Sequence, residues 1–367
     1  MKARAIAAAF DPRRLELART AAGILKKDLA AMIQVTPSAV SQFEAGLARP
    51  SPITVQRLAL ALGFPPTFFA HRHAVPEVGS AAHFRSLRST TQRERRMALA
   101  HAVLLWDLVQ ELAKSVEFPD VGIPQFDVGA GAGLEVIEEI AAVTRQEWSI
   151  APGPVSNVVR HLEAKGTLVT RLTLDTERVN AFSCDIGSRP MVVLAADKNN
   201  KERSRFDAAH ELGHLVMHQD AEPANPDAER QANSFAAAFL MPEGDIRDEL
   251  PSRYDLPRFI ELKGRWGVSI QALLYRCRTL GRVSDSGFRR SMAAFSSQFG
   301  RRTEPGPVGT AERPTLIRNA VDLYISSGRT LEQLADASQV PVRVIADIAA
   351  LEPALPSARP DGPWESA

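Results

Sequence analysis

Residues 205–218 read RFDAAHELGHLVMH, and this stretch determines how the rest of the chain is interpreted. It contains His210, Glu211 and His214 in an H-E-x-x-H pattern. Residues four apart lie one above the other on a helix, so His210 and His214 can direct two imidazoles at one metal ion. Zn²⁺ suits such nitrogen ligands. Glu211, beside the first imidazole, is placed to act as a general base toward water at that metal.

Two imidazoles supply only part of a catalytic zinc site, which needs a third protein ligand. Residues 226–242, PDAERQANSFAAAFLMP, repeat Ala, Phe and Leu at helical spacing and place Glu229 in the first turns of a second helix. If this helix packs on the first, Glu229 can reach the metal. His218, one turn beyond His214, and Asp220 are the alternative ligands.

Composition limits the class of protein. The chain has 367 residues, enough for two or three domains, with 45% hydrophobic and 24% charged residues. Its net charge is +1, so a nucleic-acid partner needs a local basic patch. Cys184 and Cys277 fit no ligand spacing and indicate reduced thiols in a cytoplasmic protein. No signal peptide or membrane-spanning run is found, so no membrane partner is expected.

Residues 10–72 predict five short helices, several of which open with a capping residue followed by proline. Asp11-Pro12 opens the first and Thr36-Pro37 the third, and Gly63 ends the fourth. Two helices joined by the short turn at residues 34–35 form a helix-turn-helix. Residues 1–72 contain ten basic and four acidic groups, so their net charge is 10 − 4 = +6. This local charge favours a nucleic-acid partner.

These residues resemble the Xre/Cro-type family of DNA-binding domains, through Leu29-Ala30, Val40-Ser41, Glu44-x-Gly46 and residues 58–63, LALALG. The resemblance implies that residues 36–42 enter the major groove of double-stranded operator DNA, and that the protein is a homodimer on a two-fold site. The side chains expected to meet base edges are Thr36, Ser38, Ser41 and Gln42. Those expected to meet phosphates are Lys26 and Lys27.

Residues 73–133 predict a helical linker. A run of arginines, Arg85, Arg88, Arg93, Arg95 and Arg96, extends into the start of a long helix over residues 92–116 with an apolar stripe. Residues 167–174 and 180–186 alternate as strands do, and residues 190–195, PMVVLA, form a buried run. The turn residues between these three segments predict antiparallel hairpins.

Residues 134–280 resemble the ImmA/IrrE family of zinc-dependent endopeptidases. The resemblance rests on residues 205–206 and 209–214, on Glu229-x-x-x-Asn233-x-Phe235-Ala236, and on Arg265-Trp266-x-Val268-Ser269. It implies that Glu229 is the third zinc ligand, that the domain has a gluzincin-like core, and that the substrate is a partner repressor. Members of the family are often fused to a helix-turn-helix protein.

The expected fold is mostly α with a small antiparallel sheet. An N-terminal all-α helix-turn-helix domain at 10–72 and a linker at 73–133 precede an α+β gluzincin-like zinc peptidase domain at 134–280. A C-terminal helical region follows at 281–355, in which the arginine-rich residues 281–312 predict a mobile segment, and a disordered tail follows at 356–367.

Three functions are compatible with these patterns. The first is a transcriptional regulator that also cleaves a protein, with Zn²⁺ as cofactor. The second is a regulator or antitoxin whose zinc domain senses a ligand or partner without proteolysis. The third is a free-standing protease whose N-terminal domain recognises only protein.

Overall fold

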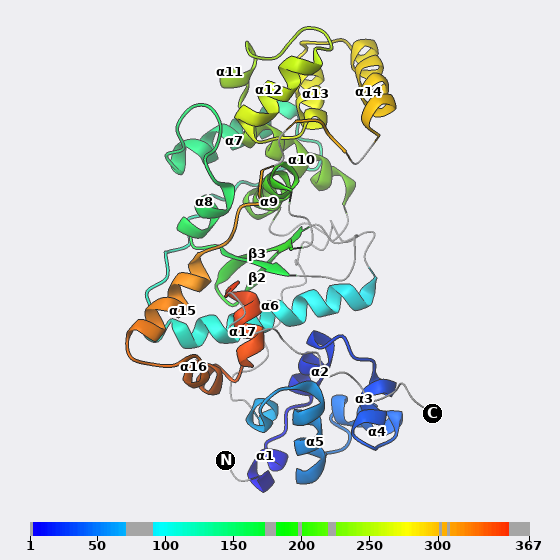
Figure 1. Ribbon diagram of the computed structural model, residues 1–367, viewed down its shortest axis with the longest axis vertical. Helices are drawn as coiled ribbons and strands as arrows, with labels where there is room; N and C mark the ends of the chain where they lie inside the picture. Colours follow the sequence, from blue (N-terminus) through cyan, green and yellow to red (C-terminus); the bar gives the residue numbers. More distant parts are fainter. Residues whose placement is uncertain are drawn as a thin grey trace.

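The computed structural model describes residues 3–70, 91–172, 181–196, 200–218, 225–300, 303–306 and 309–351. Asp220 and the tail at 356–367 lie outside these residues. Figure 1 shows the N-terminal helices at one end of an elongated molecule, helices α11–α14 at the other end, and the sheet between them.

The N-terminal domain consists of short helices: α1 (Ala3–Ala8), α2 (Pro12–Ala21), α3 (Lys26–Met32), α4 (Pro37–Glu44), α5 (Pro52–Leu62) and the 3₁₀ helix η1 (Pro66–Ala70). Side chains cap α2, α4 and α5, and Thr36 Oγ1, for example, accepts a hydrogen bond from the Ala39 amide at 3.1 Å. Gly63 ends α5 at a positive φ of 70°. Helix α1 was not predicted from the sequence.

Helix α6 (Gln92–Leu112) is a long helix against which the N-terminal domain packs. Thr91 and Glu94 form a capping box at its start. Arg14 of α2 and Asp107 of α6 form an ion pair, and their side chains are 0% and 1% exposed. The Arg14 guanidinium also lies 5.3 Å from the ring centroid of Phe68. The contact between domain and helix is therefore charged as well as apolar.

The three strands are β1 (Leu168–Leu172), β2 (Ala181–Ile186) and β3 (Arg189–Ala195), and they lie in the order β1-β3-β2. Strands β2 and β3 form the expected antiparallel hairpin. The prediction of an antiparallel β1 was wrong, because β1 pairs with β3 in parallel. Only Gly187 and Ser188 separate β2 from β3, whereas residues 173–188 separate β1 from β3 and are long enough for a crossover.

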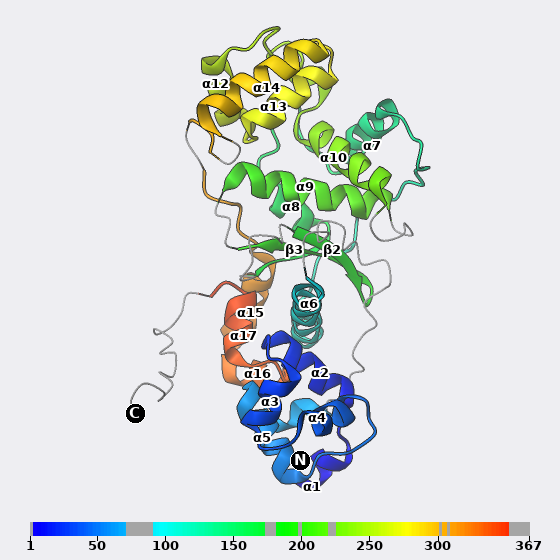
Figure 2. The same cartoon turned by 90° about the vertical axis from the view of Figure 1, so that its right-hand side faces the viewer.

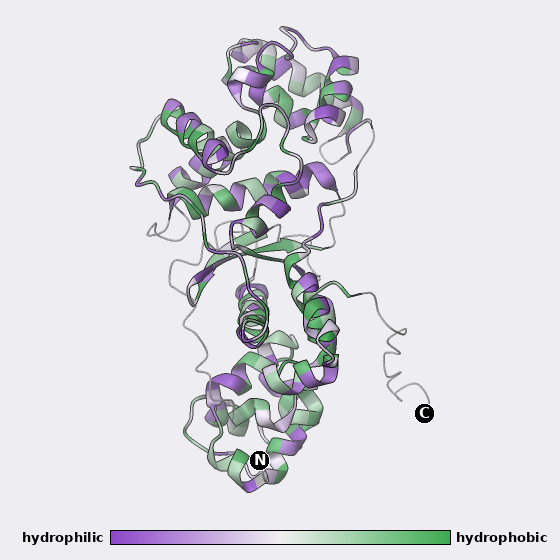
Figure 3. Ribbon diagram, turned by 90° about the vertical axis from the view of Figure 1, so that its left-hand side faces the viewer, coloured by the Kyte–Doolittle hydropathy of each residue, from purple (hydrophilic) through white to green (hydrophobic). Residues whose placement is uncertain are grey.

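The sheet separates two hydrophobic cores. Phe182 and Met191 point into a core shared with α6 and the N- and C-terminal helices. Val192 and Leu194 point into the other core, formed with the helices that follow the sheet. Figure 3 shows β3 largely in the colour of hydrophobic residues, which fits a strand covered on both faces.

The second core is closed by eight helices. They are α7 (Leu134–Glu147), α8 (Val158–Ala164), α9 (Lys201–Met217), α10 (Pro226–Leu240), α11 (Glu243–Ile246), α12 (Leu256–Trp266), α13 (Ile270–Thr279) and α14 (Asp285–Phe299). The prediction of a mobile segment at 281–312 was wrong over residues 285–299, because α14 is a regular helix. Its Phe288 and Phe295 side chains are buried in that core.

The C-terminal helices fold back to the N-terminal domain. They are α15 (Leu316–Ser326), α16 (Leu331–Ser338) and α17 (Val342–Ile348). Arg343 Nη2 donates to the Leu62 carbonyl oxygen at 2.9 Å, at the end of α5. The buried Glu163 carboxylate of α8 accepts hydrogen bonds from the amides of Thr315 and Leu316, both at 2.9 Å. The C-terminal helices therefore contact both the N-terminal domain and α8.

Among the helices of the described residues, none is both long enough and apolar enough to pass through a bilayer.

Replacing Asp107 by Ala should lower the free energy of unfolding by about 3–5 kcal/mol, because the Arg14 charge would stay buried without its partner. Replacing Lys114 by Ala is the matched control on the same stretch of chain. It removes an exposed ion pair with Glu111 and should cost at most about 1 kcal/mol. Urea unfolding followed by circular dichroism measures both. Equal losses would contradict the burial of the Arg14–Asp107 pair.

Candidate metal centre

The candidate site lies where α9 packs on α10, above the sheet (Figure 2). Gly213 occupies the contact between the two helices. A Cβ atom at Gly213 would lie 3.1 Å from Phe235 Cδ1 and 3.3 Å from Ala232 Cα. The absence of a side chain at Gly213 therefore lets α10 approach closely, and this approach brings Glu229 toward the imidazoles of α9.

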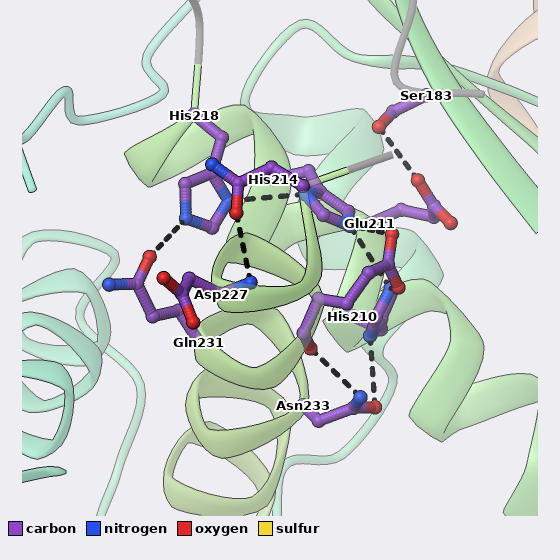
Figure 4. Close-up of polar contacts among 10 residues, drawn as sticks. Ser183, His210, Glu211, His214, His218, Asp227, Gln231 and Asn233 are labelled. Carbon is purple, nitrogen blue, oxygen red and sulfur yellow. Dashed lines mark hydrogen bonds and ion pairs between the residues drawn. The ribbon is translucent and has the colours of Figure 1, made fainter. Parts of the chain in front are cut away.

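Three ligand atoms converge at this contact. Glu229 Oε2 lies 3.4 Å from His210 Nε2, Glu229 Oε1 lies 3.6 Å from His214 Nε2, and the two Nε2 atoms are 3.1 Å apart. All three residues offer one ligand atom within 4.8 Å of the others. The structure therefore brings together the three residues that the sequence predicts as a metal site, as Figure 4 shows for the imidazoles.

Hydrogen bonds define the tautomer of His210. Asn233 Nδ2 donates to the Glu229 carbonyl oxygen at 2.8 Å, which leaves Asn233 Oδ1 as an acceptor. This oxygen lies 3.1 Å from His210 Nδ1, so Nδ1 carries the proton and donates to it. In a neutral imidazole the other nitrogen, Nε2, then has a free lone pair directed toward Glu229.

A longer chain of hydrogen bonds does the same for His214. Gln231 Nε2 donates to the Gly129 carbonyl oxygen at 2.9 Å, so Gln231 Oε1 accepts from His218 Nε2 at 2.8 Å. His218 Nδ1 is then the acceptor for His214 Nδ1, which lies 3.1 Å away. In a neutral His214 the lone pair is then on Nε2, the ring nitrogen that lies 3.1 Å from His210 Nε2. His218, an alternative ligand in the sequence analysis, thus orients His214 through the ring nitrogen that faces away from the site.

The donor set fits a cation. Two Nε2 lone pairs face each other, and the buried Glu229 Oε1 has no hydrogen-bond partner among the described residues. Buried acceptors without a donor are costly, and a positive charge among them removes the cost. The same environment affects protonation. Burial lowers the pKa of His210, but the hydrogen bond that the protonated ring donates to Glu229 and the charges of Glu211 and Glu229 outweigh it and raise the pKa overall.

Glu211 lies on a different face of α9 and points to the sheet. The Ser183 hydroxyl of β2 donates a hydrogen bond to Glu211 Oε2 at 2.7 Å (Figure 4). Burial raises the pKa of Glu211 to about 7, and the charge of His210 and the Ser183 hydrogen bond oppose this rise. Glu211 is thus a buried carboxyl group beside the three converging ligand atoms but not one of them.

The predicted DNA-contacting residues lie at the start of α3 and on or just before α4. Thr36, Ser38, Ser41 and Gln42 are exposed on or just before α4. Lys27 is also exposed, whereas Lys26 forms an ion pair with Glu44 at 2.8 Å. The structure therefore leaves this surface open, with part of the Lys26 charge neutralised.

Comparison with family models gives two matches. Residues 162–278 match the Peptidase M78 model, described as the IrrE N-terminal-like domain. Residues 15–69 match a helix-turn-helix model. The chain is a fusion of these two domains. Among curated proteins, the comparison finds no match to this chain. The matched part of the IrrE-like domain runs from α8 through the sheet to α13 and contains all four residues of the H-E-x-x-H and Glu229 set.

Sequence reasoning missed three residues that orient the side chains of the IrrE-like domain. Ser183 is a polar residue of β2 between Phe182 and Cys184, which are both buried. A polar residue in such a position is a signal for a buried hydrogen bond. Asn233 lies one helical turn after Glu229, and its only signal in the sequence is its place in the family resemblance. Gln231 had no signal, because its partners Gly129 and His218 are distant in sequence.

Replacing Gly213 by Val should lower the stability of the IrrE-like domain by about 1–3 kcal/mol, because the side chain would overlap Phe235 and Ala232. Replacing Gly264 by Ala in α12 is the control, since no heavy atom lies within 4 Å of its added Cβ. That change should be neutral or stabilise the helix by up to about 1 kcal/mol. Thermal unfolding measures both, and a stable Gly213→Val protein would contradict the close packing of α9 and α10.

Proposed function

We propose that this protein is a DNA-binding transcriptional regulator whose IrrE-like domain is a zinc-dependent endopeptidase that cleaves a repressor or another partner protein. The convergence of His210 Nε2, His214 Nε2 and the Glu229 carboxylate, with Glu211 beside them, carries the enzymatic half of this proposal. The peptidase role belongs to residues 134–280 and the DNA-binding role to residues 10–72, with 73–133 as the linker.

His210, His214 and Glu229 would hold Zn²⁺. When bound, the ion supplies a Lewis acid for the peptide carbonyl and lowers the pKa of water to about 7. Glu211 then acts as the general base and passes the proton to the leaving amine. Ser183 holds the Glu211 carboxylate in position from β2. Asn233 and His218 keep the Nε2 lone pairs of the two imidazoles directed at the ion.

The DNA-binding half is supported by the helix-turn-helix match, by the local charge of +6 in residues 1–72 and by the exposed polar face of α4. In this proposal Thr36, Ser38, Ser41 and Gln42 meet base edges, and Lys26 and Lys27 meet phosphates. Such modules bind two-fold operators as dimers, so the proposed active form is a cytoplasmic homodimer. The two buried free cysteines are consistent with a reducing compartment.

A metal and cleavage assay on single-residue variants tests the enzymatic half. The wild-type protein should bind one Zn²⁺ per chain, and Glu229→Ala should weaken the affinity by more than about 100-fold, since even orienting residues are worth about 10–100-fold. Asp227→Ala removes an exposed carboxylate from the same turn of α10 and should leave the affinity unchanged. Inductively coupled plasma mass spectrometry and competition with a chelating dye measure stoichiometry and affinity.

In the same assay Glu211→Gln should keep zinc but lose cleavage by at least about 10²–10⁴-fold, because the general base is gone. Proteolysis is followed by mass spectrometry on peptides and on proteins encoded by neighbouring genes. Unchanged cleavage by Glu211→Gln would contradict the mechanism. Zinc binding without cleavage of any protein would favour the alternative function, a regulator that senses a ligand or partner without proteolysis.

The DNA-binding half predicts a salt-sensitive complex with the operator. Replacing Gln42 by Ala should weaken specific binding by about 1–3 kcal/mol, because a base contact is lost. Replacing Gln56, an exposed glutamine of α5, is the control and should have no effect. Fluorescence anisotropy at several salt concentrations measures both. Binding to DNA that does not depend on salt or on Gln42 would contradict this assignment.

A further inference from the structure

A cavity of about 270 Å³ lies at the turn between β2 and β3, next to α9. Its lining includes Val121, Ile123, Gln125, Asp185, Pro190 and Leu215. Pockets for whole small molecules usually measure about 300–1,000 Å³. This cavity is smaller and open to solvent, so its size suits one long side chain rather than a cofactor.

The spacing of residues on β2 and α9 locates the cavity relative to Glu211. Ser183 and Asp185 are two apart on β2 and therefore point to the same face, about 7 Å apart along the strand. Glu211 and Leu215 are four apart on α9 and lie on one face, about 6 Å apart along the helix. Ser183 contacts Glu211, whereas Asp185 and Leu215 line the cavity. The cavity is therefore displaced from Glu211 by about two residues along β2, or about one turn along α9.

Asp185 is the charged residue of a mixed lining. Pro190 lies opposite it in the β2–β3 ladder, Val121, Ile123 and Leu215 contribute apolar side chains, and Gln125 and Ser188 contribute polar ones. The ion pairs found among the described residues do not include Asp185. Asp185 is exposed to solvent, and partial desolvation of its carboxyl group raises its pKa. An acidic residue beside the apolar side chains of Val121, Ile123 and Leu215 is complementary to a side chain with an alkyl stem and a cationic end.

We propose that this cavity is the specificity pocket of the peptidase and that it receives a lysine or arginine side chain of the substrate protein. This inference rests on the proposed endopeptidase function. Since an extended peptide advances about 3.4 Å per residue, the basic residue lies within about two residues of the cleaved bond. Val121, Ile123 and Leu215 contact the methylenes of that side chain, and Asp185 binds its charged end.

Cleavage-site profiling tests the pocket. The zinc-loaded full-length protein is incubated with a peptide library derived from a bacterial proteome, and the cleaved bonds are identified by mass spectrometry. Lysine and arginine should be enriched at one position within two residues of the cleaved bond. Asp185→Asn should reduce the preference for Lys over Gln on the order of tenfold in kcat/KM, and Asp185→Lys should reverse it toward acidic residues.

Asp248→Asn is the matched control, because it removes one exposed carboxylate outside the cavity lining. It should leave the cleavage profile unchanged. Asp185→Asn should keep the zinc content and the thermal unfolding midpoint of the wild type, which separates loss of recognition from loss of folding.

A binding measurement separates the pocket from the enzymatic activity. Two fluorescein-labelled octapeptides that differ only in one central residue, Lys or Gln, are titrated with the zinc-loaded Glu211→Gln protein. A preference for Lys that disappears in Glu211→Gln/Asp185→Asn supports the pocket even if the wild type cleaves no peptide, a result that would contradict only the endopeptidase function. Cleavage without a basic preference, or equal binding of both octapeptides, overturns the pocket.

Discussion

The close approach of α9 and α10 is the constraint on which the candidate site depends. The H-E-x-x-H pattern aligns two imidazoles by helix geometry alone, but a carboxylate must come from another element. At Gly213 the neighbouring helix packs against a backbone without a side chain, with Phe235 and Ala232 in contact. This approach places Glu229 3.4 Å from one imidazole nitrogen and 3.6 Å from the other. The hydrogen-bonded tautomers of both histidines then place the two Nε2 nitrogens next to the Glu229 carboxylate, whose Oε1 has no hydrogen-bond partner among the described residues.

The sheet gives this helix pair a rigid support. Its strands are covered on both faces, so Ser183 can point to Glu211 while the adjacent Phe182 points into the opposite core. Because side chains alternate between the two faces of a strand, one face of β2 carries the polar contact with Glu211 and the other carries the apolar packing. The same period places Asp185 beside Ser183, so that a single short strand supplies both the group that positions the base and the acidic end of the neighbouring cavity.

The elements that could be predicted from the sequence are those that local rules determine. Capping residues and glycines defined α2–α5, and helical periodicity defined α9 and α10 with His210, Glu211, His214 and Glu229. The parallel pairing of β1, the return of α15–α17 to α5, and the role of His218 could not be predicted. Each depends on residues far apart in the chain, such as Arg343 with Leu62 or Gln231 with Gly129, and periodicity contains no information about such pairs.

The N-terminal domain is held to the rest of the molecule by contacts that are costly to break separately. Separating α2 from α6 would break the ion pair between Arg14 and Asp107, whose side chains are almost completely buried, and would leave each charge without its partner. Separating α5 from α17 would break the bond between Arg343 and Leu62. Helices α6 and α17 in turn pack on the face of the sheet opposite α9. If these contacts stay intact, α6 and α17 move together with the helix-turn-helix domain. The orientation of that domain is therefore coupled to the sheet that supports Glu211.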